Sequence, residues 1–295
     1  MFKSGFVTVV GRSNVGKSTL LNHIMEQKLS IVTNKAQTTR SRIQLIFTNE
    51  EMQVIFIDTP GIQKPKNKLG EYMLDISESA LKDVDIITYV VDISDIIGEN
   101  ENYILEKLQS LDQKIILVIN KMDLVSENKL EEIVEMYKKY NIFESIIPIS
   151  ALNGRNIHLY LEALYRNLEE GPMFYPEDAI TDQTERTIVS ELIREKALLF
   201  LKDEIPHGIT VTIESMKERN NRKLMDIDAT IVVEKKSHKG MVIGKGGKMI
   251  QKIGSTARVD IEKFLDEKVN LQLWVKIDEN WRANEQKLKR LGFHK

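Results

Sequence analysis

Short apolar runs alternate with longer segments of helical periodicity through the first 170 residues of the chain. Five of these runs are rich in valine and isoleucine and predict strands at residues 5–10, 52–58, 86–92, 114–120 and 145–149. Strands interleaved with helices form a largely parallel sheet that is covered on both faces, and such sheets bind ligands at the carboxyl ends of their strands. The first part of the chain is therefore predicted to be an α/β domain. Three of the five runs end directly in a polar motif.

The second half follows a different order of elements. The pattern predicts an amphipathic helix at 184–201, strands at 208–216, 226–234 and 270–277, a glycine-broken helical region at 240–266 and a last helix at 280–291. Two of the six prolines fall within residues 169–178, which predicts a linker between the halves. We therefore expect a first domain at 1–170, a linker at 171–180, and an α+β domain at 181–295 with its core at about 201–279.

The composition limits the chemistry that the chain can perform. No apolar run approaches the roughly 18 residues that cross a bilayer, and the N-terminus lacks a signal-peptide pattern, so we expect a cytoplasmic protein. The chain has no cysteine, which excludes disulfides, thiol catalysis and cysteine-based zinc sites. The five histidines show no paired metal-ligand spacing. Any bound metal is therefore expected to be a hard, oxygen-ligated cation.

Charge is distributed unevenly although the formal net charge is only −2. The first 180 residues contain 19 basic and 26 acidic residues, and the remainder contains 23 basic and 18 acidic residues. A basic second half favours an anionic partner, but an ordinary solvated surface would produce the same balance.

The first polar motif, Gly11–Ser18, matches the pattern G-x-x-x-x-G-K-S between a predicted strand and a predicted helix. In that setting backbone N–H groups point at phosphate oxygens, Lys17 reaches the β and γ phosphates, and Ser18 offers its hydroxyl to Mg²⁺. The alternative is a glycine-rich turn that only caps the helix.

Two further motifs follow apolar strands and complete a nucleotide site. The carboxylate of Asp58, at the start of Asp58–Gly61, reaches Mg²⁺ through water, and Gly61 places a backbone N–H on the γ-phosphate. Within Asn120–Asp123, the Asp123 carboxylate accepts both the N1–H and the N2 amino protons of guanine, a pair of donors that adenine lacks. The segment Ser150–Leu152 adds a backbone N–H for the guanine O6. The motifs therefore predict a guanine nucleotide, and they disfavour a metabolic P-loop kinase.

With these motifs, the first 170 residues resemble small GTPases of the translation-factor-related class. The resemblance places the switch I threonine in Gln37-Thr38-Thr39-Arg40, where Thr39 matches best and Thr38 remains open. The alternative for this segment is a polar solvent loop.

One residue departs from the Ras-like pattern, in which a glutamine that orients water follows the glycine of switch II. This chain has Ile62 there, and isoleucine cannot hydrogen-bond water. Similar GTPases with a hydrophobic residue at this place use a K⁺ ion held partly by a P-loop asparagine, which Asn14 matches. The alternative is that Asn14 supports only the hydrogen bonds of its own loop. The resemblance implies slow turnover that K⁺ or a partner raises.

The predicted residues of the first domain fall into three groups. The predicted GTP-binding residues are Gly11, Arg12, Ser13, Asn14, Val15, Gly16, Lys17, Ser18, Thr19, Asp58, Thr59, Pro60, Gly61, Ile62, Asn120, Lys121, Met122, Asp123, Ser150, Ala151 and Leu152. The predicted catalytic residues are Asn14, Lys17, Thr39 and Gly61, and the predicted Mg²⁺ ligands are Ser18, Thr39 and, through water, Asp58.

In the second half, residues 243–248 place a G-x-x-G tetrapeptide between two helical patterns. The order helix, strand, strand, helix, G-x-x-G, helix, strand resembles the bacterial KH arrangement, type II, which binds about four nucleotides of single-stranded RNA. A dinucleotide fingerprint fits less well because no apolar strand directly precedes the glycines. The predicted RNA-binding residues are Ile243, Gly244, Lys245, Gly246, Gly247, Lys248 and Lys252.

Apolar residues near this loop are expected to be mostly core, with a few lining an RNA groove: Val242, Ile243, Ile250, Ile253, Val259 and Ile261. Aromatic and basic residues of the last helix would extend the RNA site or form a solvated face: Trp281, Arg282, Lys287, Lys289 and Arg290.

From end to end, one GTPase domain followed by one KH domain in 295 residues resembles the Era family of bacterial GTPases. The resemblance implies that the protein binds and hydrolyses GTP with Mg²⁺, binds the single-stranded 3′ end of 16S ribosomal RNA, and assists assembly of the 30S ribosomal subunit. It also implies peripheral association with the cytoplasmic face of the cell membrane. We separately expect a monomer. The alternative is a membrane-associated or cell-cycle signalling GTPase whose C-terminal domain docks proteins.

Overall fold

The computed structural model describes residues 1–295 except 34, 36–37, 203–204, 220–222 and 294–295. The chain forms two compact units. The first comprises Met1–Ser30, Thr39–Pro65 and Gly70–Asp182, and the second comprises Ile31–Thr38, Lys66–Leu69 and Gln183–Lys295. Among the described residues, none of the helices combines the length and the apolar character that a membrane span needs.

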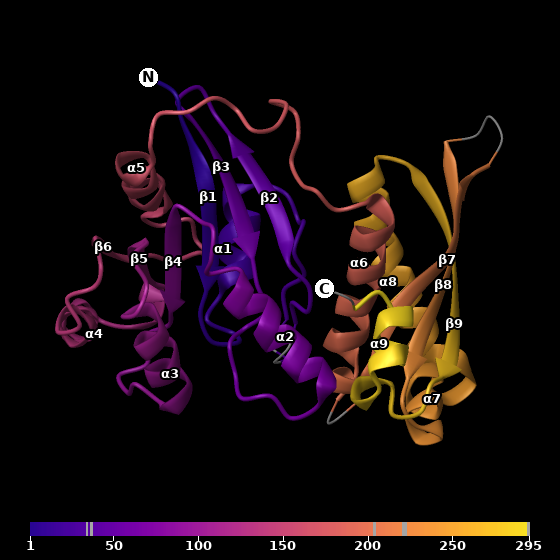
Figure 1. The fold of residues 1–295 in the computed structure, drawn as a ribbon. Helices are drawn as coiled ribbons and strands as arrows, with labels where there is room; N and C mark the ends of the chain where they lie inside the picture. The colour runs from indigo at the N-terminus through magenta and orange to yellow at the C-terminus, as the bar shows by residue number, and fades with distance from the viewer. Residues whose placement is uncertain (34, 36–37, 203–204, 220–222, 294–295) are drawn as a thin grey trace. The chain divides into compact units, whose positions relative to one another are not determined.

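The first unit is built on a six-stranded sheet with the order β2-β3-β1-β4-β5-β6 (Figure 1). Its strands are β1 (Lys3–Val10), β2 (Ile43–Thr48), β3 (Met52–Asp58), β4 (Ile86–Val91), β5 (Lys114–Ile119) and β6 (Ser145–Pro148). All neighbouring pairs are parallel except β2 and β3, which are antiparallel. The helices are α1 (Lys17–Ile24), α2 (Lys68–Ser79), α3 (Glu99–Leu108), α4 (Glu127–Lys138) and α5 (Ile157–Asn167).

Alternation along the central strands distributes their side chains between two helical layers. On β4, Ile87, Tyr89 and Val91 join the core cluster that includes residues of α3 and α4. The residue between two of them, Thr88, hydrogen-bonds instead to the hydroxyl of Tyr160 on α5 at 2.8 Å. Both faces are thus buried, which is why the strands read as continuous apolar runs.

Strand β2 was absent from the sequence prediction. Its sequence, Ile-Gln-Leu-Ile-Phe-Thr, is rich in the β-branched and aromatic residues that favour strands, but it is short and follows a polar segment. It pairs in antiparallel fashion at the edge of the sheet, outside the strand-and-helix alternation on which the prediction relied.

The segment predicted to be a linker is hydrogen-bonded to the edge of this sheet. The side-chain oxygen of the buried Gln53 on β3 accepts from the backbone N–H groups of Phe174 at 2.7 Å and Tyr175 at 2.9 Å. Further along, Ile46 of β2 donates its N–H to the carbonyl of Ile180 at 3.0 Å. The segment is therefore attached to the first unit at several points.

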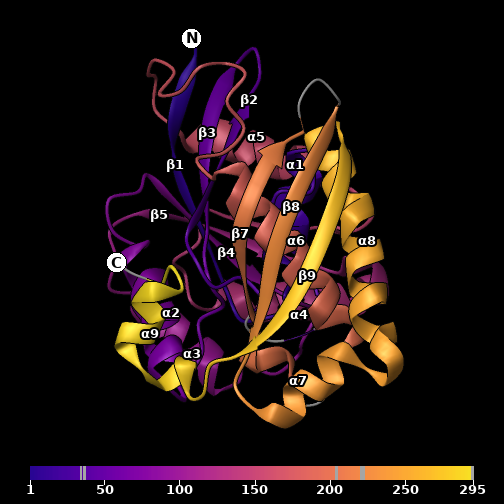
Figure 2. The same ribbon diagram turned by 90° about the vertical axis from the view of Figure 1, so that its right-hand side faces the viewer.

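The second unit contains a three-stranded sheet, β7 (Thr210–Glu218), β8 (Leu224–Val233) and β9 (Lys268–Ile277), in that order. Strands β7 and β8 are antiparallel, and β8 and β9 are parallel. In Figure 2 the sheet faces the viewer and helices α6 (Glu185–Phe200) and α8 (Lys248–Leu265) lie behind it. Buried residues at strand spacing on β8, from Ile227 to Val233, and at helical spacing on α8, from Ile253 to Ile261, form this core.

The remaining helices of this unit are α7 (Lys236–Ile243) and α9 (Glu285–Arg290). The helical region expected at 240–266 is thus two helices, and the first begins four residues earlier than predicted. Val259 of α8, expected mainly as core, is 62% exposed. Trp281, in contrast, is fully buried, donates its indole N–H to the carbonyl of Gly208 at 3.2 Å and stacks on Phe293. The predicted role of Trp281 on an RNA surface was wrong because this residue anchors the C-terminal segment to the core.

Candidate nucleotide site and GxxG loop

The loop between β1 and α1 can only be formed with glycine at its two motif positions. Gly11 and Gly16 have φ values of 152° and 101°, in the region that favours glycine. A β-carbon at Gly11 would collide with the backbone oxygen of Val90, and one at Gly16 would collide with the amide nitrogen of Asn120. The backbone of this loop is therefore pressed against the ends of two neighbouring strands.

Lys17 is buried at the first position of α1. Its ammonium group donates to the carbonyl oxygens of Gly11 at 3.2 Å and Arg12 at 2.9 Å. Burial lowers the pKa of Lys17 to about 8, and the nearby charge of Asp58 opposes that shift. Burial of a charged group costs free energy unless the group is paired. The ammonium group inside the loop is therefore placed to contact anionic phosphate oxygens.

Three oxygen-bearing side chains converge beside the first turn of α1. The Ser18 hydroxyl lies 3.0 Å from Asp58 Oδ2 and 3.1 Å from the Thr39 hydroxyl. Burial raises the pKa of Asp58, against the charge of Lys17 and the hydrogen bond from Ser18. Its other oxygen, Oδ1, is buried with no hydrogen-bond partner of suitable geometry among the described residues. An all-oxygen donor set with an unsatisfied buried carboxylate oxygen fits Mg²⁺.

The structure separates the two candidate switch I threonines. The Thr39 hydroxyl lies next to Ser18. The Thr38 hydroxyl bonds instead to the Lys35 carbonyl at 2.6 Å and to the Thr33 hydroxyl at 2.8 Å. The geometry favours Thr39 as the metal ligand. Gln37 of the same segment lies outside the described residues.

The segment Asp58–Gly61 is held in place by two hydroxyl groups and by packing on the phosphate loop. The Thr59 hydroxyl donates to the Val9 carbonyl at 2.9 Å, and the hydroxyl of Ser77 on α2 donates to the Pro60 carbonyl at 2.8 Å. A β-carbon at Gly61 would lie 2.6 Å from the backbone nitrogen of Ser13, so this glycine packs directly on the phosphate loop. Ser77 is a supporting residue that no sequence motif indicated.

Ile62 is 1% exposed and belongs to the hydrophobic core cluster. Its backbone N–H donates to the Gly11 carbonyl at 3.2 Å. The side chain is therefore turned inward, where it can neither contact nor orient a water molecule at the γ-phosphate.

Asn120 connects three loops instead of presenting its side chain to solvent. Its amide nitrogen donates to the Val15 carbonyl at 2.9 Å, and its oxygen accepts from the backbone N–H groups of Lys121 and Ala151 at 2.8 and 2.9 Å. It is 3% exposed. The two strand-end motifs and the phosphate loop are thus locked into one arrangement by a single side chain.

The half-buried Asp123 follows this junction, in a short 3₁₀ turn at Met122–Leu124. No hydrogen bond or ion pair occupies its carboxylate among the described residues. The segment Ser150–Leu152 lies on the neighbouring strand end, with Leu152 77% exposed. The free carboxylate of Asp123 suits the two N–H donors of a guanine base. The N–H of Ala151 is donated to the Asn120 side chain and that of Ser150 to the Arg155 carbonyl.

The side chain of Arg12, a predicted GTP-binding residue, has partners within the protein. Its guanidinium group forms ion pairs with Asp92 at 3.1 Å and with Glu101 of α3 at 2.9 Å. Lys121 joins this group, with 2.9 Å to the Asn14 carbonyl and 3.4 Å to Asp92. The side chain of Arg12 therefore supports the loop through its ion pairs. The position of Asp92 at the carboxyl end of the predicted strand 86–92 was a signal that could have indicated this network.

In the second unit, the G-x-x-G loop lies between α7 and α8. Gly244, Gly246 and Gly247 have φ values of 72°, 60° and 77°. A β-carbon at Gly246 or Gly247 would meet nothing within 4 Å among the described residues, and the side chains of Lys245 and Lys248 are exposed. The loop thus presents an open glycine backbone flanked by two lysines, as a nucleic-acid backbone requires.

Other basic residues predicted near RNA already interact with side chains of the protein. The Lys252 ammonium lies 4.2 Å from the centre of the Phe200 ring, which the sequence did not indicate. Arg282 pairs with Glu234, and Lys287 and Arg290 pair with Asp278. Lys245 and Lys248 are therefore the stronger phosphate-binding candidates.

Comparison with known proteins agrees with the domain class predicted for each half of the chain. Residues 6–121 match the family model of the 50S ribosome-binding GTPases, and residues 204–282 match the KH domain model. The chain is 50% identical over 295 residues to GTPase Era of Clostridioides difficile, covering 100% of this chain and 99% of that protein. It is 51% identical to GTPase Era of Alkaliphilus oremlandii over 292 residues, covering 99% of each.

Two solved structures superpose along the whole chain, each with 36% identity and 100% coverage of both chains. One is Era in complex with MgGDPNP and nucleotides 1506–1542 of 16S ribosomal RNA, with a TM-score of 0.96. The other is a variant of Aquifex aeolicus Era bound to GDP and aluminium fluoride, with a TM-score of 0.95.

Fold and site together define a P-loop GTPase domain followed by a type II KH domain. The chain belongs to the Era family of GTPases.

Proposed function

We propose that the protein hydrolyses GTP with Mg²⁺ and uses its KH domain to bind the single-stranded 3′ end of 16S ribosomal RNA during assembly of the 30S subunit. The observation that carries the proposal is the convergence of Lys17, Ser18, Thr39 and Asp58 in a chain with an intact G-x-x-G loop. The full-length likeness to Era in complex with a GTP analogue and 16S ribosomal RNA supports both parts.

In this proposal each part of the nucleotide has its own residues. Lys17 exchanges its two carbonyl partners for the β and γ phosphate oxygens, and Asp123 accepts the two donors of guanine. Ser18 and Thr39 would hold Mg²⁺ directly, and Asp58 would hold it through water. The metal, when bound, neutralises charge on the β and γ oxygens. Gly61 directs its N–H at the γ-phosphate.

We further propose that hydrolysis is slow and that K⁺ assists it. Because Ile62 is buried, no side chain at this position orients the attacking water. Asn14, at φ 68° in the phosphate loop, is the proposed K⁺ ligand, and the ion would add positive charge beside the β–γ bridge. The test compares turnover in KCl and NaCl at equal ionic strength. We expect several-fold faster turnover in KCl, lost in Asn14→Ala; equal rates in both salts would remove K⁺ from the proposal.

For RNA, the exposed backbone of Gly246 and Gly247 allows close approach of the RNA backbone, and Lys245 and Lys248 contact phosphates.

We also propose that the protein is a monomer and that it is cytoplasmic. Sedimentation would test the oligomeric state. Peripheral contact with the inner face of the cell membrane stays a prediction from the family resemblance, testable by flotation with anionic vesicles.

The central experiment measures binding of the full chain to an RNA matching the 3′ end of 16S ribosomal RNA and to a scrambled RNA. Each is measured with GDP and with GDPNP at one fixed, near-physiological salt concentration, because phosphate contacts weaken as salt rises. We expect tight, sequence-selective binding that GDPNP favours. Equal, weak binding to both RNAs would contradict the RNA part while leaving the GTPase part intact.

A further inference from the structure

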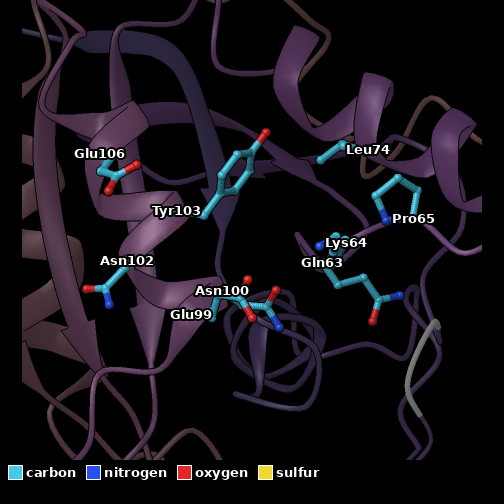
Figure 3. A pocket seen from close by; sticks show the side chains of 9 residues that line it. All are labelled: Gln63, Lys64, Pro65, Leu74, Glu99, Asn100, Asn102, Tyr103 and Glu106. Atoms are coloured by element: carbon cyan, nitrogen blue, oxygen red, sulfur yellow. The ribbon is translucent and has the colours of Figure 1, made fainter.

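A pocket of about 600 Å³ opens in the first unit between α3 and the segment that follows Gly61 (Figure 3). We name it the α2–α3 pocket. Its lining consists of Gln63, Lys64, Pro65, Leu74, Glu99, Asn100, Asn102, Tyr103 and Glu106. A volume of this size lies in the range of ligand pockets, roughly 300–1,000 Å³. It uses none of the residues assigned above to GTP, Mg²⁺ or RNA.

Part of the pocket lining is apolar or aromatic, namely Pro65, Leu74 and the ring of Tyr103. Figure 3 shows the Tyr103 ring extending from α3 toward Leu74 of α2. Tyr103 is 39% exposed, and its hydroxyl donates to Glu78 at 2.6 Å, which holds the ring in place. Lys107, paired with the same Glu78 at 2.9 Å, lies 5.1 Å from the ring centre. The ring is therefore a fixed surface against which an apolar or planar group can pack.

The rim of the pocket has an excess of unpaired negative charge. Among the described residues, the carboxylates of Glu99 and Glu106 form no ion pair or hydrogen bond, whereas Lys64 is the single lining cation. The first 180 residues as a whole contain 26 acidic and 19 basic residues. Such a surface repels the phosphates of a nucleic acid and attracts a basic group. Arginine fits both features, because its planar guanidinium binds carboxylates and stacks on aromatic rings.

Both walls of the pocket are attached to the phosphate-binding loop. The wall at residues 63–65 begins next to Ile62, whose N–H donates to the Gly11 carbonyl at 3.2 Å. The opposite wall, α3, is joined to the same loop through the 2.9 Å ion pair between Glu101 and Arg12. Glu101 lies between two lining residues, Asn100 and Asn102. Both walls of the pocket are therefore bonded, directly or through a neighbouring residue, to the phosphate-binding loop.

We propose that the α2–α3 pocket is a docking site for a partner-protein segment that carries an arginine beside an apolar side chain, and that the bound nucleotide controls its opening. The nucleotide dependence rests on the proposed GTP site. The arginine binds at Glu99 and Glu106, and the apolar side chain packs on Tyr103 and Leu74.

The test selects peptides from a randomised seven-residue display library on the full chain loaded with GDPNP, with depletion on the Leu74→Arg variant. We expect the enriched peptides to share an arginine next to an apolar residue. The enriched peptide is then titrated against the protein in its GDP and GDPNP forms, where we expect affinities that differ at least fivefold. Glu106→Lys should weaken binding at least fivefold, whereas Glu131→Lys, the same charge change at an exposed position on α4, should leave it unchanged.

Enrichment of acidic or purely apolar peptides would overturn the docking proposal. The proposal would also be overturned if the enriched peptides bound the Leu74→Arg variant as well as the unchanged protein, or if no peptide were enriched. Equal affinity in the two nucleotide forms would overturn the control by nucleotide. GTP binding and turnover of Glu106→Lys, measured in parallel, should equal those of the unchanged protein. If the unchanged protein fails to bind GTP, the proposed function fails; if it binds GTP but selects no such peptide, only the pocket proposal fails.

Discussion

The protein contains two glycine-rich loops that each lead into a helix, and the glycines serve opposite purposes. In the phosphate loop, a β-carbon at Gly16 would collide with Asn120, so glycine is required by what packs against it from inside the protein. In the G-x-x-G loop, Gly246 and Gly247 face open space among the described residues. There the positive φ values and the approach of a ligand from outside require glycine. The glycines of one loop are required by packing within the protein, and those of the other lie on an open surface.

The lysines differ in the same way. Lys17 is 6% exposed, and its pKa is lowered to about 8 by burial. Lys245 and Lys248 are exposed beside their glycines. A buried lysine contributes to binding one ligand at short range, whereas exposed lysines provide salt-dependent attraction. Substitutions at the first loop should therefore have larger effects than substitutions at the second.

The largest effect is expected for Lys17→Ala. Removing the buried ammonium group leaves the β and γ phosphates without their main cation, and we expect turnover of GTP to fall about 1,000-fold. Single-turnover hydrolysis measures the loss. Lys82→Ala, at an exposed lysine of the same unit, serves as the control and should retain full activity. A loss of less than tenfold would show that Lys17 does not contact the phosphates.

The next largest effect is expected for Asp123→Asn. The amide cannot accept both guanine donors, so GTP affinity should fall at least about 100-fold. Affinity for xanthosine triphosphate should rise, because its C2 oxygen can accept from the new amide. Competition between the two nucleotides measures the change. Unchanged preference for GTP would contradict the assignment of Asp123 to the base.

A smaller effect is expected at the open loop. Gly246→Asp places a negative side chain where the RNA backbone approaches, and we expect RNA affinity to fall about 30-fold without a change in GTP turnover. Gly292→Asp is the matched control, because Gly292 also has a positive φ, 90°, and open space around its β-carbon among the described residues. Equal RNA losses in both variants would indicate a general effect of charge and not contact at this loop.

The smallest effect concerns pH. Lys17 is protonated below its pKa of about 8 and loses its proton above it, and anionic phosphates bind the protonated form. Affinity for GDP should therefore be nearly full below about pH 7 and fall about tenfold between pH 7 and pH 9. Isothermal titration measures the trend. Guanosine, which has no phosphates, should show no such fall, and a parallel fall for guanosine would assign the pH dependence to another group.

Much of the nucleotide site could be predicted because its chemistry belongs to contiguous residues. The segment Gly11–Ser18 curls around phosphate through its own backbone, so spacing alone indicates what it does. The apolar runs that precede Asp58 and Asn120 indicated that these motifs meet at one sheet edge. The glycine pattern at 244–247, with the surrounding order of elements, likewise indicated the KH domain. Strand β2 was missed because it lies outside the alternating pattern.

The hydrogen-bond partners of particular side chains, however, could not be predicted from the sequence. The sequence predicted that Asn120 belongs to the guanine motif, but only the folded chain shows it bonded to Val15 and Ala151. Likewise, only packing decides that Thr39 and not Thr38 meets Ser18. These contacts join residues that lie 21 to 105 positions apart, and local sequence carries no record of them.

The sequence by itself determined the class of the protein, its two ligand-binding loops and the base that it is expected to select, because each depends on a short run of residues with fixed geometry. The tertiary structure decided which side chains are buried. Trp281 is in the core although it follows the pattern of a surface helix, and Val259 is exposed although it is apolar. The physical reason is that burial depends on which elements pack together, and many arrangements of the same pattern bury a similar amount of apolar surface.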